Sequence, residues 1–120
     1  MPVGVAGHLP EVHLWINKMD LVDFHVVPFF NCGSLHVAGG GDRFWLEDMP
    51  RAIDVIQTIQ KPCIAYKVLG AGRIDAFTGL SYAYRNIKPG DVINLGMNRA
   101  DNDNIVEEDV RIVAELLHSK

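Results

Sequence analysis

Residues 62–72, PCIAYKVLGAG, decide the fold class. The run 63–69 has the apolar content of a buried strand, and Gly70-Ala71-Gly72 leads from it into a segment with helical periodicity. That segment carries Phe77, Leu80, Tyr84 and Ile87 on one face, and Lys88-Pro89-Gly90 ends it. A strand, a glycine turn and an amphipathic helix in this order predict a βα unit.

The same order of apolar run and helical segment occurs in three further places. The expected strands are 2–6, 21–30 and 91–97. The helices after them should turn these residues inward: Val12, Trp15, Ile16 and Met19; Ile53, Ile56 and Ile59; Val106, Val110, Val113 and Leu117. We expect Asp48 to cap the second of these helices. The sequence thus predicts a single α/β domain over residues 1–120, with four βα units around a parallel sheet.

Four βα units are half of a TIM-type (β/α)8 barrel. A four-stranded parallel sheet with helices on one face leaves two edges and one apolar face uncovered. A homodimer that closes the barrel or an N-terminal half on another chain would cover them. An open sandwich with helices on both faces, or a truncated gene product, would also explain four units in one chain.

Composition narrows the function classes. The 120 residues include 48% hydrophobic residues, and 11 Lys+Arg against 15 Asp+Glu give a net charge of -4. No basic cluster offers a nucleic-acid footprint, and no apolar run approaches the roughly 20 residues of a membrane span. The first residues lack the pattern of a signal peptide. Cys32 and Cys63 lie far apart outside any CxxC motif, which favours free thiols in the cytoplasm.

Working residues of parallel α/β proteins lie after the carboxyl ends of strands. Here those positions hold Gly7-His8, residues 30–32, Tyr66 and Lys67, residues 70–73 and residues 96–99. Two turns after consecutive strands contain glycine: Gly70-Ala71-Gly72, followed by Arg73, and Leu95-Gly96-Met97-Asn98. Such turns can hold a phosphate with backbone N–H groups at a helix start, or serve only as tight turns.

Lys67 and His8 are the candidate catalytic residues. A lysine inside an apolar strand can act as a Schiff-base nucleophile, contact a phosphate, or simply reach solvent or an acidic partner. His8 can serve as a general acid or base, or cap the next helix. Asp23 and His25 alternate onto one strand face, but without a third ligand we predict no metal site.

The common nucleotide and hydrolase motifs are missing. No GxGxxG follows a strand, and neither GxxxxGK[ST] nor GxSxG is present. We interpret Gly39-Gly40-Gly41 as a flexible turn or flap, and His36 in the same loop has no ligand-like spacing.

The order of four segments resembles the C-terminal half of the aldo/keto reductases, NADPH-dependent (β/α)8 oxidoreductases. Residues 3–11, VGVAGHLPE, look like the family's fifth-strand GVSxHxPE, and 22–31 look like its VDxxQxxYN stretch. Residues 62–72 resemble the seventh-strand AYSxLG or MKPLGGG pattern. Residues 93–97, INLGM, with Glu107-Glu108-Asp109 resemble the eighth-strand VIPGM and the downstream EEN.

This resemblance implies a partial NADPH or phosphate site. Tyr66 would stack on the nicotinamide, and Lys67, Leu69 and Gly70 would lie along the pyrophosphate. Gly72 and Arg73 continue that turn. Gly96, Met97 and Asn98 would also lie at the cofactor, and Glu108 would lie near the adenosine. The Lys-Ser and Arg that bind the 2′-phosphate in the family are replaced around Gly96, Met97 and Ile105, which leaves Arg99 as the nearby cation.

The family's catalytic residues belong to its first four strands, which have no counterpart here. The resemblance therefore implies an oxidoreductase only after completion by a second half. Two further hypotheses stay open: a class-I-aldolase-like lyase that uses Lys67 as its Schiff base, and a non-catalytic, self-associating barrel fragment.

Overall fold

The computed structural model describes residues 1–32 and 44–119, and it confirms an α/β fold of four βα units. The elements are β1 (Gly4–Ala6), α1 (Pro10–Met19), β2 (Phe24–Pro28), α2 (Asp48–Thr58), β3 (Cys63–Tyr66), α3 (Ala76–Asn86), β4 (Val92–Ile93) and α4 (Ile105–His118). All strands are parallel and lie in the order β1-β2-β3-β4. The predicted Gly39-Gly40-Gly41 turn and His36 lie outside the described residues.

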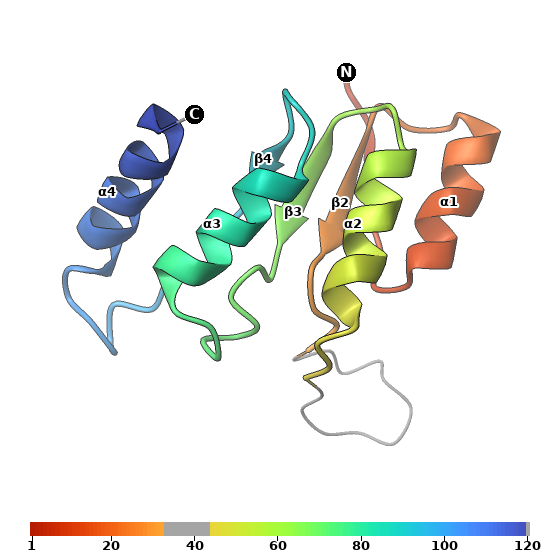
Figure 1. The fold of residues 1–120 in the computed structure, drawn as a ribbon. Coiled ribbons are helices and arrows are strands. Elements are labelled where there is room, and N and C mark those ends of the chain that lie inside the picture. Colours follow the sequence, from red (N-terminus) through yellow and green to blue (C-terminus); the bar gives the residue numbers. More distant parts are fainter. Residues whose placement is uncertain (33–43, 120) are drawn as a thin grey trace.

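The sequential strand order decides where the helices lie. Right-handed connections between neighbouring parallel strands place each connecting helix on the same face of the sheet. Figure 1 shows α1, α2 and α3 side by side over one face, while α4 packs against α3 at the β4 end. The connecting helices α1, α2 and α3 thus cover one face of the sheet.

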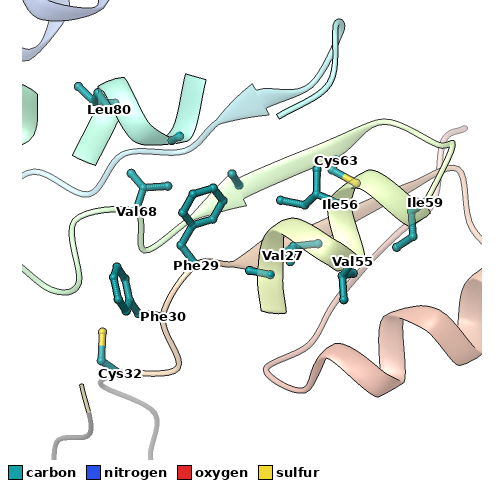
Figure 2. Packing of buried hydrophobic residues seen from close by; sticks show 13 residues of the cluster. Val27, Phe29, Phe30, Cys32, Val55, Ile56, Ile59, Cys63, Val68 and Leu80 are labelled. Carbon is teal, nitrogen blue, oxygen red and sulfur yellow. The ribbon is translucent and has the colours of Figure 1, made fainter. Parts of the chain in front are cut away.

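The core lies between this covered face and the helices. Val27 of β2 and Ala65 of β3 point toward α2, whose Ile56 is fully buried, and Phe29 and Phe30 continue the core beyond β2. Figure 2 shows α2, the strands and α3 contributing to this cluster. Burial of these apolar side chains is the main stabilising contribution to the four-unit arrangement.

The opposite face of the sheet is apolar and incompletely covered. We call it the open face: Phe24, Val26, Ile64, Tyr66 and Val92, which the register brings into adjacent rows. None of the five side chains is fully buried, and Val92 is 52% exposed. Apolar surface of this kind is stabilised by a further layer.

Several predicted inward positions are wrong. Trp15 and Met19 of α1, and Phe77 of α3, are largely exposed. In α4, Val110 and Leu117 are exposed, whereas Val113 packs on the core as predicted, together with Ile112 and Leu116. For α1 and α4 the physical reason is that each is an outer helix with few neighbours, so that only part of its apolar surface is buried.

Asp48 is also not the cap that we expected. It is the first residue of α2, after an N-cap Glu47 that makes no side-chain cap bond. Its Oδ2 instead accepts a hydrogen bond from the backbone N–H of Asn31 at 3.0 Å. The carboxylate therefore ties the segment after β2 to the start of α2.

The strands are shorter than the apolar runs that predict them. β2 covers Phe24–Pro28 within the expected 21–30, and β4 only Val92–Ile93 within 91–97. β3 ends at Tyr66 because Lys67 adopts a left-handed backbone with φ of 55°. A left-handed residue turns the chain out of the extended geometry that the ladder requires.

Candidate functional site

The carboxyl ends of β3 and β4 enclose a pocket of about 600 Å³. Its lining combines the chain after β3 with the chain after β4: Cys32, Tyr66, Lys67, Val68, Leu69, Ala71, Gly72, Asn94, Leu95, Gly96, Met97, Asn98, Asp101 and Ile105. We call it the β3–β4 pocket. Most of the predicted cofactor-binding residues lie in this lining.

Lys67 is the basic residue of the β3–β4 pocket lining. Its Nζ donates a hydrogen bond to the carbonyl oxygen of Cys32 at 2.7 Å and lies 5.7 Å from the centroid of the Tyr66 ring. An ammonium group has three N–H donors, and the bond to Cys32 uses one of them. Lys67 is therefore held at the pocket wall, and its remaining N–H groups can donate hydrogen bonds to a ligand.

Tyr66 joins the pocket to the open face of the sheet. Its ring is partly buried, and this burial raises the pKa of the phenol, which therefore stays neutral at physiological pH. A neutral aromatic ring next to a cation can stack on a planar ligand while the cation contacts an anionic group.

The turn after β3 is built from left-handed residues. Gly70 and Ala71 have φ of 58° and Gly72 has φ of 83°. A Cβ at Gly70 would lie 2.4 Å from Phe44, so this glycine contacts the core and does not line the pocket. At Gly72 and Gly96, a Cβ would meet nothing within 4 Å, so the backbone there is open to a bound group.

The start of α3 does not favour an anion. The carboxylate of Asp75 accepts a hydrogen bond from the backbone N–H of Thr78 at 3.0 Å, and hydrogen bonds with the side chain and then the backbone of Thr78 lower the pKa of Asp75. A phosphate at the start of α3 would face this carboxylate, which argues against that part of the predicted phosphate loop. A ligand phosphate would contact Lys67 instead.

Arg73 and Glu108 lie outside the β3–β4 pocket lining. Arg73 donates to the Gly70 carbonyl oxygen at 2.9 Å, and its guanidinium lies 5.3 Å from the Phe44 ring centroid. Glu108 accepts a hydrogen bond from the Asn102 side-chain amide at 2.8 Å in the first turn of α4. Both side chains stabilise their own turns.

His8 lines a second, smaller pocket at the carboxyl ends of β1 and β2. This pocket has a volume of about 130 Å³, and His13, Asn31 and Arg51 also line it. The two predicted catalytic residues, His8 and Lys67, thus belong to different pockets. The chain does not bring them together as one acid–base pair.

Asp23 and His25 point to different partners. Asp23 Oδ2 accepts a hydrogen bond from the backbone N–H of Val3 at 2.7 Å, whereas His25 is completely buried. Within the described residues, no group of three or more His, Cys, Asp or Glu side chains could hold a metal ion.

The contact between His13 and His25 is the polar feature that sequence reasoning missed. The two Nδ1 atoms lie 3.1 Å apart, and both rings are 0% exposed. The sequence does contain a signal that His25 is buried. His25 lies two residues before the inward-facing Val27, and alternate residues of a strand share a face. The sequence pattern pairs His25 with Asp23 instead, which lies nearer along the chain.

The chain matches no protein-family model, no curated protein and no solved structure. Among the described helices, none has the length and apolar character needed to cross a membrane.

Proposed function

We propose that this chain is half of a (β/α)8-type barrel that binds a phosphate-bearing small molecule in the β3–β4 pocket. NADPH is the specific candidate, and an aldo/keto-reductase-like hydride transfer is the reaction that a completed barrel would perform. One observation supports this proposal most directly: Tyr66, Lys67 and the open backbone at Gly72 and Gly96 all line the same pocket.

Charge and shape support a ligand with an anionic and a planar part. Lys67 supplies the positive charge, and its hydrogen bond to Cys32 leaves further N–H donors. The ring of Tyr66 and the apolar walls at Leu69 and Met97 suit a planar group. The Asn98 side chain donates to Asp101 at 3.2 Å, which fixes the pocket wall after β4.

A second four-stranded half would complete the barrel and the catalytic residues that this chain lacks. The open face and the edges β1 and β4 are the surfaces that it would cover. A second copy of this chain supplies four parallel strands and so brings the total to eight. The two buried free thiols fit a reducing compartment, and we propose a cytoplasmic location.

An NADPH titration tests the proposed site. Saturable binding, followed by calorimetry with NADH for comparison, should be weakened at least about 10-fold in Lys67→Met because a charge-assisted contact is lost. Tyr66→Ala should also weaken binding. Lys18→Met is the matched control, since Lys18 is exposed on α1, and it should bind as the wild type does.

Absence of binding up to millimolar NADPH by a folded chain would reject this cofactor. Saturable binding that is unchanged in both Lys67→Met and Tyr66→Ala would reject the β3–β4 pocket as its site. Circular dichroism of each variant distinguishes a lost contact from a lost fold.

The hypothesis of Lys67 as a Schiff-base nucleophile is favoured by one observation. Among the described lysines, Lys67 is the one that lines the β3–β4 pocket. Borohydride reduction in the presence of carbonyl substrates would then label Lys67 and leave Lys18 unmodified. A lack of labelling across a panel of sugar phosphates and hydroxy aldehydes would reject this lyase.

A further inference from the structure

The only fully buried side chain of α1 is a titratable one. Among the ten residues of this helix, all described, His13 alone is buried. By contrast, α2 buries Ala52, Val55 and Ile56, which do not titrate. Besides the partly buried Leu14, α1 therefore packs inward with a group that can take up a proton, whereas the buried groups of α2 are apolar.

The hydrogen bonds of the pair determine its tautomers. His13 Nε2 lies 2.9 Å from the Gly7 carbonyl oxygen, an acceptor, so this nitrogen carries the proton. Neutral His13 then accepts at Nδ1 from the Nδ1–H of His25. His25 Nε2 is left without a proton, and it is buried without a hydrogen-bond partner among the described residues.

This arrangement has no place for an added proton. A proton on His13 Nδ1 would face the N–H of His25, and a proton on His25 Nε2 would find no acceptor among the described residues. Burial lowers the pKa of His13, and burial and then the charge of His13 lower the pKa of His25. A charged imidazole in a buried position without a carboxylate partner is strongly disfavoured.

The surrounding charges act in the same direction. Lys61 from the turn before β3 and Lys88 from the turn before β4 both lower the pKa of His25. Cys63, the register neighbour of His25 on β3, carries a thiol whose pKa is raised by burial, so it stays neutral. The nearby carboxylate of Asp91 already pairs with Lys88 at 2.9 Å.

Charged groups on the elements of the pair itself do not compensate. On α1, Glu11 and Lys18 are exposed. Next to β2, the exposed Asp23 accepts from the Val3 backbone. Glu11 of α1 and Asp48 and Arg51 of α2, the helix that packs against α1, line the same pocket as His13, and Asp48 accepts a hydrogen bond from the backbone N–H of Asn31. Within the described residues, neither ring has a hydrogen bond or an ion pair with a carboxylate; the hydrogen bonds of the pair are those to each other and to Gly7.

We propose that the His13–His25 contact makes the docking of the β1–α1 unit acid-sensitive, so that mild acidification releases α1 while the α2–β3–α3 core stays folded. Above pH 6.5, the ordinary value for histidine, both rings are neutral in either state and the contact is intact. Below that value the two histidines bind protons in the released state but not in the docked state, so docking weakens as the pH falls.

Hydrogen exchange of the full chain, resolved by segment, tests this inference. Between pH 7.5 and pH 5.0, protection of the α1 amides should fall about 30-fold for each histidine that is protonated only on release, after correction for intrinsic exchange. Amides of α2 should stay more protected than those of α1 at pH 5.0. Loss of protection in α1 and α2 together, or unchanged α1 protection, would overturn the proposal.

Variants assign the effect to the pair. In His13→Leu/His25→Leu the fall in α1 protection between the two pH values should disappear, whereas His118→Gln, at the exposed end of α4, should keep it. An undiminished fall in a folded double variant would overturn the assignment. If the double variant does not fold, ¹⁵N shifts of the wild type decide: a protonated His13 Nε2 and an unprotonated His25 Nε2 are required, and any other tautomer pattern overturns it.

Discussion

Single charged residues at the amino ends of the strands have very unequal roles in this fold. Asp91 accepts hydrogen bonds from the backbone N–H groups of Cys63 at 2.8 Å and of Lys88 at 2.9 Å, and its carboxylate pairs with the Lys88 ammonium. Its side chain is 1% exposed. Lys88 also donates to the Ile56 carbonyl oxygen, so that this pair joins α2, β3 and the turn before β4.

Asp91→Asn should therefore lower the free energy of unfolding by about 3 kcal/mol, because it leaves the mostly buried Lys88 ammonium without its counter-charge. Asp20→Asn is the matched control. Asp20 pairs with Lys61, but its side chain is 79% exposed and solvent screens the pair, so only a small change is expected. Urea unfolding of both variants measures the difference, and equal effects would contradict this role of Asp91.

Asp109 is a buried carboxylate with an unsatisfied oxygen. It is 4% exposed, and among the described residues its Oδ2 has no hydrogen-bond partner. Burial, and then the charge of Glu108, raise the pKa of Asp109 above 3.8. The folded state therefore binds this proton more tightly than the unfolded state, and the wild type loses stability as the pH rises above 3.8.

Asp109→Asn should raise the free energy of unfolding at neutral pH by about 1 kcal/mol, since no charge remains to be buried. The gain should shrink toward pH 4, where the wild-type carboxyl is protonated in part. Asp103→Asn, at an exposed position before α4, should change little. Thermal unfolding at the two pH values measures this, and a variant less stable than wild type at neutral pH would count against this role of Asp109.

Residue identity alone predicts some of these roles and not others. The turn at Lys88-Pro89-Gly90 was predictable because proline and glycine act locally, and Gly90 has φ of 91°. The His13–His25 contact was not, because it depends on how closely α1 approaches β2. Likewise, nothing local in the sequence distinguishes the buried Asp109 from the exposed Asp103.

Among the elements, the turn between β3 and α3 combines backbone strain with close packing. Gly70 and Gly72 both have left-handed φ values, but an added Cβ meets Phe44 at the first and open space at the second. The two positions therefore separate the conformational cost of a side chain from its steric cost.

Gly72→Ala should lower the free energy of unfolding by about 1 kcal/mol, the cost of a left-handed non-glycine residue. Gly70→Ala should lower it by a further 1–3 kcal/mol, roughly, because the methyl group displaces the Phe44 ring. Chemical denaturation of the two variants provides the comparison. Equal losses would show that Phe44 moves away freely and that the turn is not closely packed.

The existence and order of the helices and strands were predictable from the sequence. Which face of the outer helices α1 and α4 is buried was not. Strand and helix periodicity predicted four βα units, which the structure confirms. The inward face of α2 was correct at Ile56 and Ile59 because this helix lies between neighbours. The faces of α1 and α4 were wrong at Trp15 and Val110, since an outer helix has few neighbours to bury its apolar residues.

For the whole molecule, the sequence placed the candidate residues after the carboxyl ends of the strands but did not predict that they are divided between two pockets. The carboxyl-end rule selected Tyr66, Lys67 and Gly96 as candidates, and in the structure all three line the β3–β4 pocket. The rule did not predict that His8 lines another pocket or that the Arg73 guanidinium lies near the Phe44 ring, because these placements depend on turn geometry and packing.

At the same scale, the proposed function requires that the open face is one wall of a barrel completed by a second half. Sedimentation equilibrium of the purified chain tests this requirement most directly. We predict two copies of the 13.3 kDa chain per particle. We also predict that Ile64→Glu on the open face dissociates them, whereas Leu117→Glu, at an exposed position of α4, does not. A folded monomer across the accessible concentration range would contradict the proposal.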